Sequence, residues 1–154
     1  MIVVSFLLFF SISFYPSPVF AQVHPGLEKF NLSAKNEAEV LFARGRYKES
    51  IEKYKEVLKS EGETSYIFRA MLKAWKAMDD LSSAEKFLND YQMSTSTHIW
   101  YAFGYLNYLK ADYLNAEKAF IQAVKMDSQN GLAWNNWGAI LSEKKQYKLS
   151  LIHI

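Results

Sequence analysis

The chain has 154 residues, of which 50% are hydrophobic and 16% aromatic. This composition supplies enough apolar side chains for a packed core and excludes an intrinsically disordered chain. The 18 Lys and Arg residues against 16 Asp and Glu residues give a formal net charge of +2. Such a small, evenly distributed charge argues against a nucleic-acid partner. The absence of cysteine excludes disulfides, thiolate metal sites and cysteine nucleophiles.

The N-terminal segment differs in composition from the rest of the chain, because residues 1–27 contain no Lys, Arg, Asp or Glu. An apolar run over residues 2–15 has the length of a signal-peptide core, and two prolines interrupt it before Ala21. We therefore expect residues 1–21 to be a signal peptide cleaved after Ala21, which predicts a periplasmic or secreted protein. The alternative is a membrane anchor formed by residues 1–21, whose length approaches the roughly 20 residues that span a bilayer.

The remainder of the chain divides into a short leader and a helical domain. Residues 22–33 contain Pro25 and Gly26 without sustained periodicity, so we assign them to a leader. Residues 34–154 have apolar residues at spacings of three and four, as in Tyr47, Ile51 and Tyr54, and they predict an all-α domain. The expected helices cover residues 34–44, 47–60, 64–78, 81–93, 98–110, 113–126, 131–144 and 147 onwards.

An internal repeat is the strongest signal in the sequence. Trp100, Gly104 and Tyr113 are matched 34 residues later by Trp134, Gly138 and Tyr147. An earlier copy over residues 80–86 parallels residues 112–118 at a spacing of 32, and a more divergent one begins near Gly45. The repeating units are therefore expected at about residues 31–64, 65–96, 97–130 and 131–154.

The unit over residues 97–130 combines small and large apolar residues at fixed positions. Small residues allow two antiparallel helices to approach closely, and large ones fill the space on either side. The small residues are Gly104, Ala116 and Ala123, and the large ones are Trp100, Phe103 and Phe120. With the 34-residue period, this pattern resembles the tetratricopeptide repeat. The resemblance implies a right-handed superhelical solenoid of antiparallel helix pairs, with about three complete repeats and a truncated fourth.

The same pattern gives expectations for individual residues. Asp112 stands between two expected helices and is predicted to be the N-cap of the second. The aromatic residues at repeat positions are expected in the core rather than in contact with a ligand; they are Trp100, Tyr113, Trp134, Trp137 and Tyr147.

The resemblance implies a concave groove, lined by the first helix of each unit, that binds protein segments. Residues outside the core pattern on these helices recur at spacings of three or four and should share a face. They are Lys35, Glu39, Arg69, Lys73, Lys76, Tyr101, Tyr105, Tyr108 and Asn135. Tyr and Arg are favoured at protein interfaces, and the lysines favour an acidic or carboxylate-bearing partner. A solvated face without a partner is the alternative.

We expect no catalytic site, cofactor or metal. The three histidines, His24, His98 and His153, lie far apart, and none belongs to a cluster with metal-ligand spacing. The sequence contains no phosphate-binding glycine loop and no nucleophile motif. These absences predict a protein that is not an enzyme, and they leave protein or peptide as the expected class of partner.

The last expected helix stops at Ile154, and Leu149, Leu151 and Ile152 give it an apolar character without a polar capping helix. This predicts a fragment of a longer repeat protein; the alternative is a natural end that pairs with another copy. The leading function is an exported scaffold or adaptor that binds a partner segment. Two alternatives stay open: the recruiting arm of a longer envelope enzyme, and a self-assembling structural element.

Overall fold

The computed structural model describes residues 33–91 and 96–152, and these residues form seven α-helices without a strand. The helices are α1 (Ala34–Ala43), α2 (Tyr47–Glu61), α3 (Ser65–Ala77), α4 (Leu81–Asp90), α5 (Thr97–Leu109), α6 (Tyr113–Met126) and α7 (Gly131–Ile152). The expected signal peptide over residues 1–21 and nearly all of the leader over residues 22–33 lie outside the described residues. The first six helices follow the predicted ranges within a few residues.

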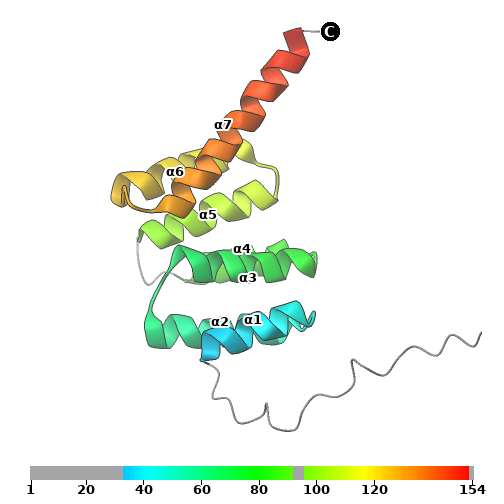
Figure 1. The fold of residues 1–154 in the computed structure, drawn as a ribbon, viewed down its shortest axis with the longest axis vertical. Helices are drawn as coiled ribbons and strands as arrows, with labels where there is room; N and C mark the ends of the chain where they lie inside the picture. The colour runs from blue at the N-terminus through cyan, green and yellow to red at the C-terminus, as the bar shows by residue number, and fades with distance from the viewer. Residues whose placement is uncertain (1–32, 92–95, 153–154) are drawn as a thin grey trace, which may run out of the picture. The chain divides into compact units, whose positions relative to one another are not determined.

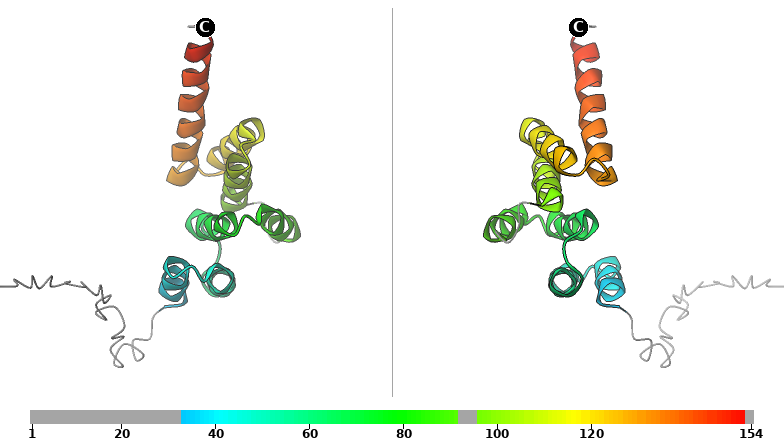
Figure 2. Two further views of the ribbon diagram at one scale, coloured as in Figure 1. Left: turned by 90° about the vertical axis from the view of Figure 1, so that its right-hand side faces the viewer. Right: turned by 90° about the vertical axis from the view of Figure 1, so that its left-hand side faces the viewer.

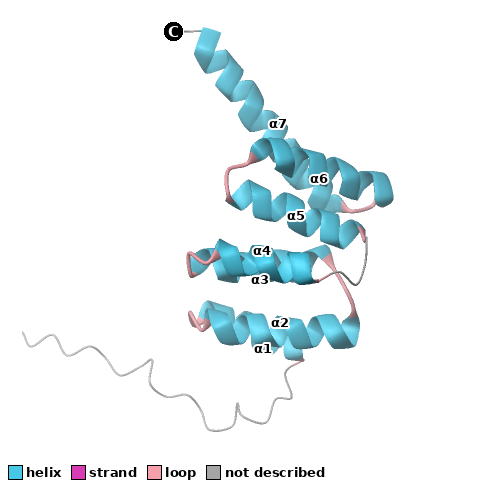
Figure 3. Ribbon diagram, turned by 180° about the vertical axis from the view of Figure 1, so that it is seen from behind, coloured by secondary structure: helices cyan, strands magenta, loops and turns pink. Residues whose placement is uncertain are grey.

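Six of the helices form three antiparallel pairs, α1 with α2, α3 with α4 and α5 with α6 (Figure 1). The pairs stack in chain order, because α3 packs against both α2 and α5, and α7 packs against α6 (Figure 2). Figure 3 shows that short loops make all of these connections in the described chain. This arrangement confirms the predicted all-α helical solenoid.

The turns inside the pairs share one backbone device. Each contains a residue with positive φ, namely Gly45 (75°), Asp79 (57°) and Ala111 (60°), a conformation that reverses the chain directly after a helix. The helices α4 and α6 then begin at a side-chain cap, Asp80 and Asp112 respectively, whereas the side chain of Arg46 at the start of α2 makes no capping hydrogen bond. Asp112 Oδ1 accepts a hydrogen bond from the Asn115 backbone N–H at 3.2 Å, which confirms Asp112 as the predicted N-cap.

The expected break between residues 144 and 147 is absent, because α7 runs without interruption from Gly131 to Ile152. By the repeat register, Lys145 stands where Ala111 turns, and Gln146 stands where Asp112 caps the following helix. Glutamine and lysine favour the helix interior and are poor N-caps. The predicted separate helix from residue 147 is therefore wrong.

The helices α5 and α6 approach each other closely at Gly104 of α5. A Cβ atom added there would lie 2.6 Å from two ring carbons of Phe120 on α6. In the first pair the helices meet at small residues too, where Ser50 Oγ donates a hydrogen bond of 2.8 Å to the Ala38 carbonyl. The second pair has Leu72 where the third has Gly104, and α4 packs less closely on α3 than α6 packs on α5.

The aromatic residues expected in the core divide into two groups. Trp100 and Trp137 are half-buried and pack against the core. Trp134 is 48% exposed and Tyr113 is 39% exposed, so their predicted burial is wrong. For Trp134 the reason is that the continuous α7 brings no second helix over its outer face. The side chain of Tyr147 lies outside the described part of the structure.

Substituting Gly104 tests the close approach. We expect Gly104→Ala to lower the free energy of unfolding by about 1–3 kcal/mol, because the added methyl group overlaps the Phe120 ring. The matched change Gly138→Ala places its methyl group in open space and should raise helix stability by up to about 1 kcal/mol. Urea unfolding followed by circular dichroism measures both, and equal effects of the two changes would contradict the packing described.

Candidate functional site

A cavity of ≈ 290 Å³ lies among α1, α2 and α3. Its lining residues are Glu39, Phe42, Tyr54, Tyr66, Arg69, Ala70 and Lys73. The cavity combines aromatic rings with two cations and one carboxylate, and three of the predicted groove residues belong to it. We call this site the α1–α3 cavity.

One edge of the α1–α3 cavity is organised around Tyr66, the second residue of α3. Its hydroxyl donates a hydrogen bond of 2.7 Å to Glu39 Oε1, and Lys35 Nζ lies 4.5 Å from the centre of its ring. The hydrogen bond to the Glu39 carboxylate raises the pKa of Tyr66, with burial as a further cause. Lys35 and Glu39 of α1 are thereby joined to α3 through one tyrosine.

The positive charge of the α1–α3 cavity comes from Arg69 and Lys73. Arg69 is half-buried, its guanidinium lies 5.8 Å from the Tyr105 ring centre, and its buried Nε has no hydrogen-bond partner in the described chain. Lys73 is exposed, and no carboxylate of the described residues lies within ion-pair distance of it. Both cations therefore retain hydrogen-bond donors for an incoming acceptor.

The three predicted tyrosines of α5 form a line of parallel rings. The ring centres of Tyr101 and Tyr105 are 6.0 Å apart, and those of Tyr105 and Tyr108 are 6.1 Å apart. Tyr101 is fully buried, its hydroxyl accepts a hydrogen bond from Asn136 Nδ2 on α7 at 3.1 Å, and burial raises its pKa. Tyr105 is only 6% exposed, and Tyr108 is half-buried.

The burial of Tyr101 and Tyr105 contradicts the prediction that all three tyrosines line a groove. Tyr101 and Tyr105 belong to the core, so the expectation that they face an open groove is wrong for them. The reason is the neighbouring helices: α7 supplies Asn136 above Tyr101, and α3 supplies Arg69 beside Tyr105. Tyr108 retains accessible surface and stays a predicted groove residue.

Two further predicted groove residues lie outside the α1–α3 cavity. Lys76 is exposed near the end of α3, and Asn135 is exposed on α7; neither is among the residues that line the cavity. Their predicted contact with a partner stays a prediction. The structure thus brings together Lys35, Glu39, Arg69 and Lys73 and leaves the other two apart.

Sequence reasoning missed Tyr66, Tyr54 and Phe42. Tyr66 precedes Arg69 by three residues and Lys73 by seven, so the spacing that groups the cations on one helix face also includes it. Tyr54 and Phe42 carry no such signal. Their positions fit the apolar core pattern, and only the packing of α1 against α2 places them at the edge of the cavity.

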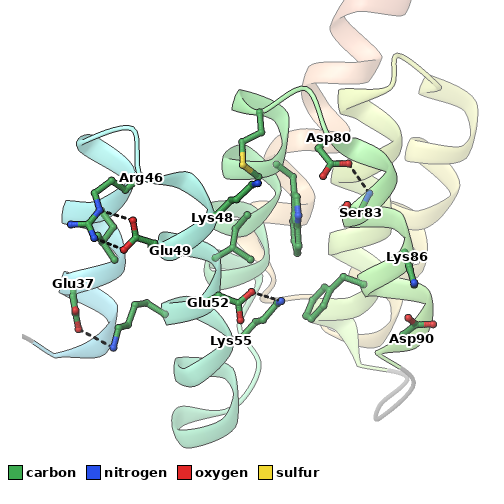
Figure 4. Close-up of a pocket in the computed structure, with 16 residues that line it drawn as sticks. Glu37, Arg46, Lys48, Glu49, Glu52, Lys55, Asp80, Ser83, Lys86 and Asp90 are labelled. Carbon is green, nitrogen blue, oxygen red and sulfur yellow. Dashed lines mark hydrogen bonds and ion pairs between the residues drawn. The ribbon is translucent and has the colours of Figure 1, made fainter.

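A larger cavity of ≈ 700 Å³ lies at α2 and α4 (Figure 4). Its apolar residues include Ile51, Trp75 and Phe87, and its rim carries charged side chains of both signs. Several of these charges are paired with each other: Arg46 with Glu49, and Lys55 with Glu52 at 2.7 Å. Because acidic and basic residues are equally numerous among the residues that line it, this cavity has less capacity to select a charged partner than the α1–α3 cavity.

The described residues contain neither a membrane-spanning helix nor a metal-binding cluster. No helix among them combines the length and apolar character needed to cross a membrane. Within the same part of the chain, no group of three or more His, Cys, Asp or Glu side chains is arranged to hold a metal ion.

Comparison with known proteins supports the predicted resemblance at the level of the fold. No protein-family model and no curated protein matches the sequence. Among solved structures, the chain is similar to the NMR structure of the first TPR domain of the human RPAP3 protein, with a TM-score of 0.53 and 17% sequence identity. The similarity covers 76% of this chain and 94% of that chain. The chain therefore has a TPR-like fold.

The burial of Tyr54 predicts a pH dependence of stability. Burial, with Tyr66 and Glu39 nearby, raises its pKa from 10.0 to about 12. Between pH 10.0 and about 12, the Tyr54 hydroxyl stays protonated in the folded protein and loses its proton in the unfolded chain. Its contribution to stability is therefore complete below pH 10.0 and is lost as the pH rises towards about 12. In this pH range the free energy of unfolding decreases as the pH rises. Tyr54→Phe should make that decrease smaller by up to about 1.4 kcal/mol per pH unit. Urea unfolding across this range measures the slope, and identical slopes would contradict the burial.

Proposed function

We propose that this chain is an exported protein-interaction module whose α1–α3 cavity binds an extended acidic segment of a partner protein. The observation that carries the proposal is the presence of Arg69 and Lys73 beside aromatic rings, without ion-pair partners in the described chain. Aromatic rings provide contact area, and the cations select carboxylates. The TPR-like fold supports a protein as the partner.

Charge at the α1–α3 cavity favours this class of partner. Among the described residues that line the cavity, Glu39 is the only acidic one, and it accepts the hydrogen bond of Tyr66. Lys35 adds a third cation above the Tyr66 ring. An incoming carboxylate would therefore meet an excess of positive charge, whereas a basic segment would be repelled.

Three peptides of equal length test the proposal by fluorescence anisotropy. They share two aromatic residues and differ only in carrying Glu, Gln or Lys at the remaining positions. We expect the Glu peptide to bind most tightly and its affinity to fall with added salt, because exposed charges are screened. Arg69→Glu combined with Lys73→Glu should weaken its binding at least about tenfold.

The control is Lys76→Glu, which makes the same substitution as Lys73→Glu on the same helix but outside the cavity. It should leave the affinity close to that of the unmodified protein. Tyr105 is unsuitable as a binding variant, since it is only 6% exposed and its truncation would disturb the core. Equal binding of the three peptides, or equal effects of Lys76→Glu and the double variant, would refute the cavity as the site.

Export forms the second part of the proposal, and it rests on the sequence of residues 1–21. The uncharged apolar run and the small residue Ala21 support a cleaved signal peptide. N-terminal sequencing of the exported protein should give Gln22 as the first residue. Recovery of the intact N-terminus in the membrane fraction would instead establish the anchor alternative.

A further inference from the structure

The charges of the α1–α3 cavity are distributed unevenly along it. Among the described residues that line it, the cations are Arg69 and Lys73, which lie one helical turn apart on α3. The carboxylate of Glu39, on α1, lies instead beside the start of α3, where Glu39 Oε1 accepts the 2.7 Å hydrogen bond of the Tyr66 hydroxyl. The cavity therefore has a basic part at Arg69 and Lys73 and an acidic part at Glu39.

The acidic part retains an acceptor for a ligand. Glu39 is exposed, and Glu39 Oε2 accepts no hydrogen bond from the residues that the structure describes. Lys35 lies one turn away on α1, but its Nζ is above the Tyr66 ring, and no ion pair joins it to Glu39. One oxygen of the Glu39 carboxylate thus stays available to an incoming cation or hydrogen-bond donor.

The basic part retains donors. Arg69 is half-buried, and its buried Nε has no hydrogen-bond partner in the described chain. Its guanidinium lies 5.8 Å from the ring centre of Tyr105, a residue that is only 6% exposed. An arginine placed against a buried ring, with donors left unused, is suited to bind a carboxylate. Lys73 follows one turn later and can reach the same group.

The separation of the two parts sets the spacing of charges in the ligand. Along α3, the midpoint between Arg69 and Lys73 lies five residues after Tyr66, which corresponds to about 7.5 Å at the helical rise. An extended chain advances about 3.3 Å per residue and covers this length in about two residues. Side chains two positions apart also share one face of an extended chain.

We propose that the segment bound in the α1–α3 cavity carries a basic residue that pairs with Glu39 and, two positions away, an acidic residue that pairs with Arg69 and Lys73. This specificity rests on the proposed function and adds an order of charges to a segment that is acidic overall. Glu39 disfavours a segment that is acidic throughout, because a second carboxylate would then face its own.

Two peptides of equal length test the specificity by fluorescence anisotropy with the purified full chain. Both contain two aromatic residues and three glutamates. They differ at one position, two residues before the central glutamate, which carries Lys in the Lys-x-Glu peptide and Gln in the Gln-x-Glu peptide. The unmodified protein should bind the Lys-x-Glu peptide about two- to fivefold more tightly, the range expected of an exposed ion pair. The net positive charge of the cavity by itself would produce the opposite order.

Glu39→Gln should abolish the preference for the Lys-x-Glu peptide, because it removes the charge that pairs with the lysine. The variant should keep the local structure, since the glutamine carbonyl can still accept the hydrogen bond of Tyr66. Glu37→Gln is the matched control. It makes the same substitution on the same helix at a residue that pairs with Lys53 at 3.3 Å outside the α1–α3 cavity, and it should leave the preference unchanged.

The outcomes separate this specificity from the proposed function. Equal or tighter binding of the Gln-x-Glu peptide by the unmodified protein would overturn the specificity alone, as would a preference that Glu39→Gln leaves unchanged. Binding of neither peptide would contradict the proposed function and the specificity together. Circular dichroism establishes that both variants keep the helical content of the unmodified protein.

Discussion

The contact between Gly104 and the ring of Phe120 sets the geometry on which the rest of the described fold depends. Because the glycine has no side chain, α6 lies directly against α5, and the buried Ala116 and Ala123 continue this contact along α6. The close pair then presents α5 to its neighbours: Tyr101 meets Asn136 of α7, and Tyr105 meets Arg69 of α3. The helix α5 thus contacts α3, α6 and α7 at once.

Where the small residue is replaced, the packing opens. Leu72 stands at the position of Gly104 in the second pair, and α4 lies less closely on α3. The larger cavity at α2 and α4 opens beside this pair, lined by Trp75 and Phe87. The α1–α3 cavity has a different origin, since polar side chains connect α1 to α3 through Tyr66. The two cavities therefore differ in charge: the larger one is lined by as many acidic as basic residues, whereas the α1–α3 cavity has an excess of cations.

The sequence was sufficient for the features that follow from local rules. Periodicity located the first six helices, and the small residues at repeat positions located their contacts. It failed where tertiary packing decides. Tyr101 was assigned to the groove, but it is buried because α7 covers it. Trp134 was assigned to the core, but it is exposed because α7 continues as a helix through Lys145. The cations of the cavity were found because Arg69 and Lys73 share one helix face, whereas Tyr54 could be placed there only from the packing of three helices.

We propose that the TPR-like fold binds an acidic segment at the α1–α3 cavity rather than at the cavity of α2 and α4. Mapping of amide chemical-shift changes by NMR during titration with a Glu-rich peptide tests it most directly, because it reports on both cavities in the same sample. The account predicts that the largest changes occur at Glu39, Tyr66, Arg69 and Lys73. Changes concentrated at Ile51, Trp75 and Phe87 would contradict it.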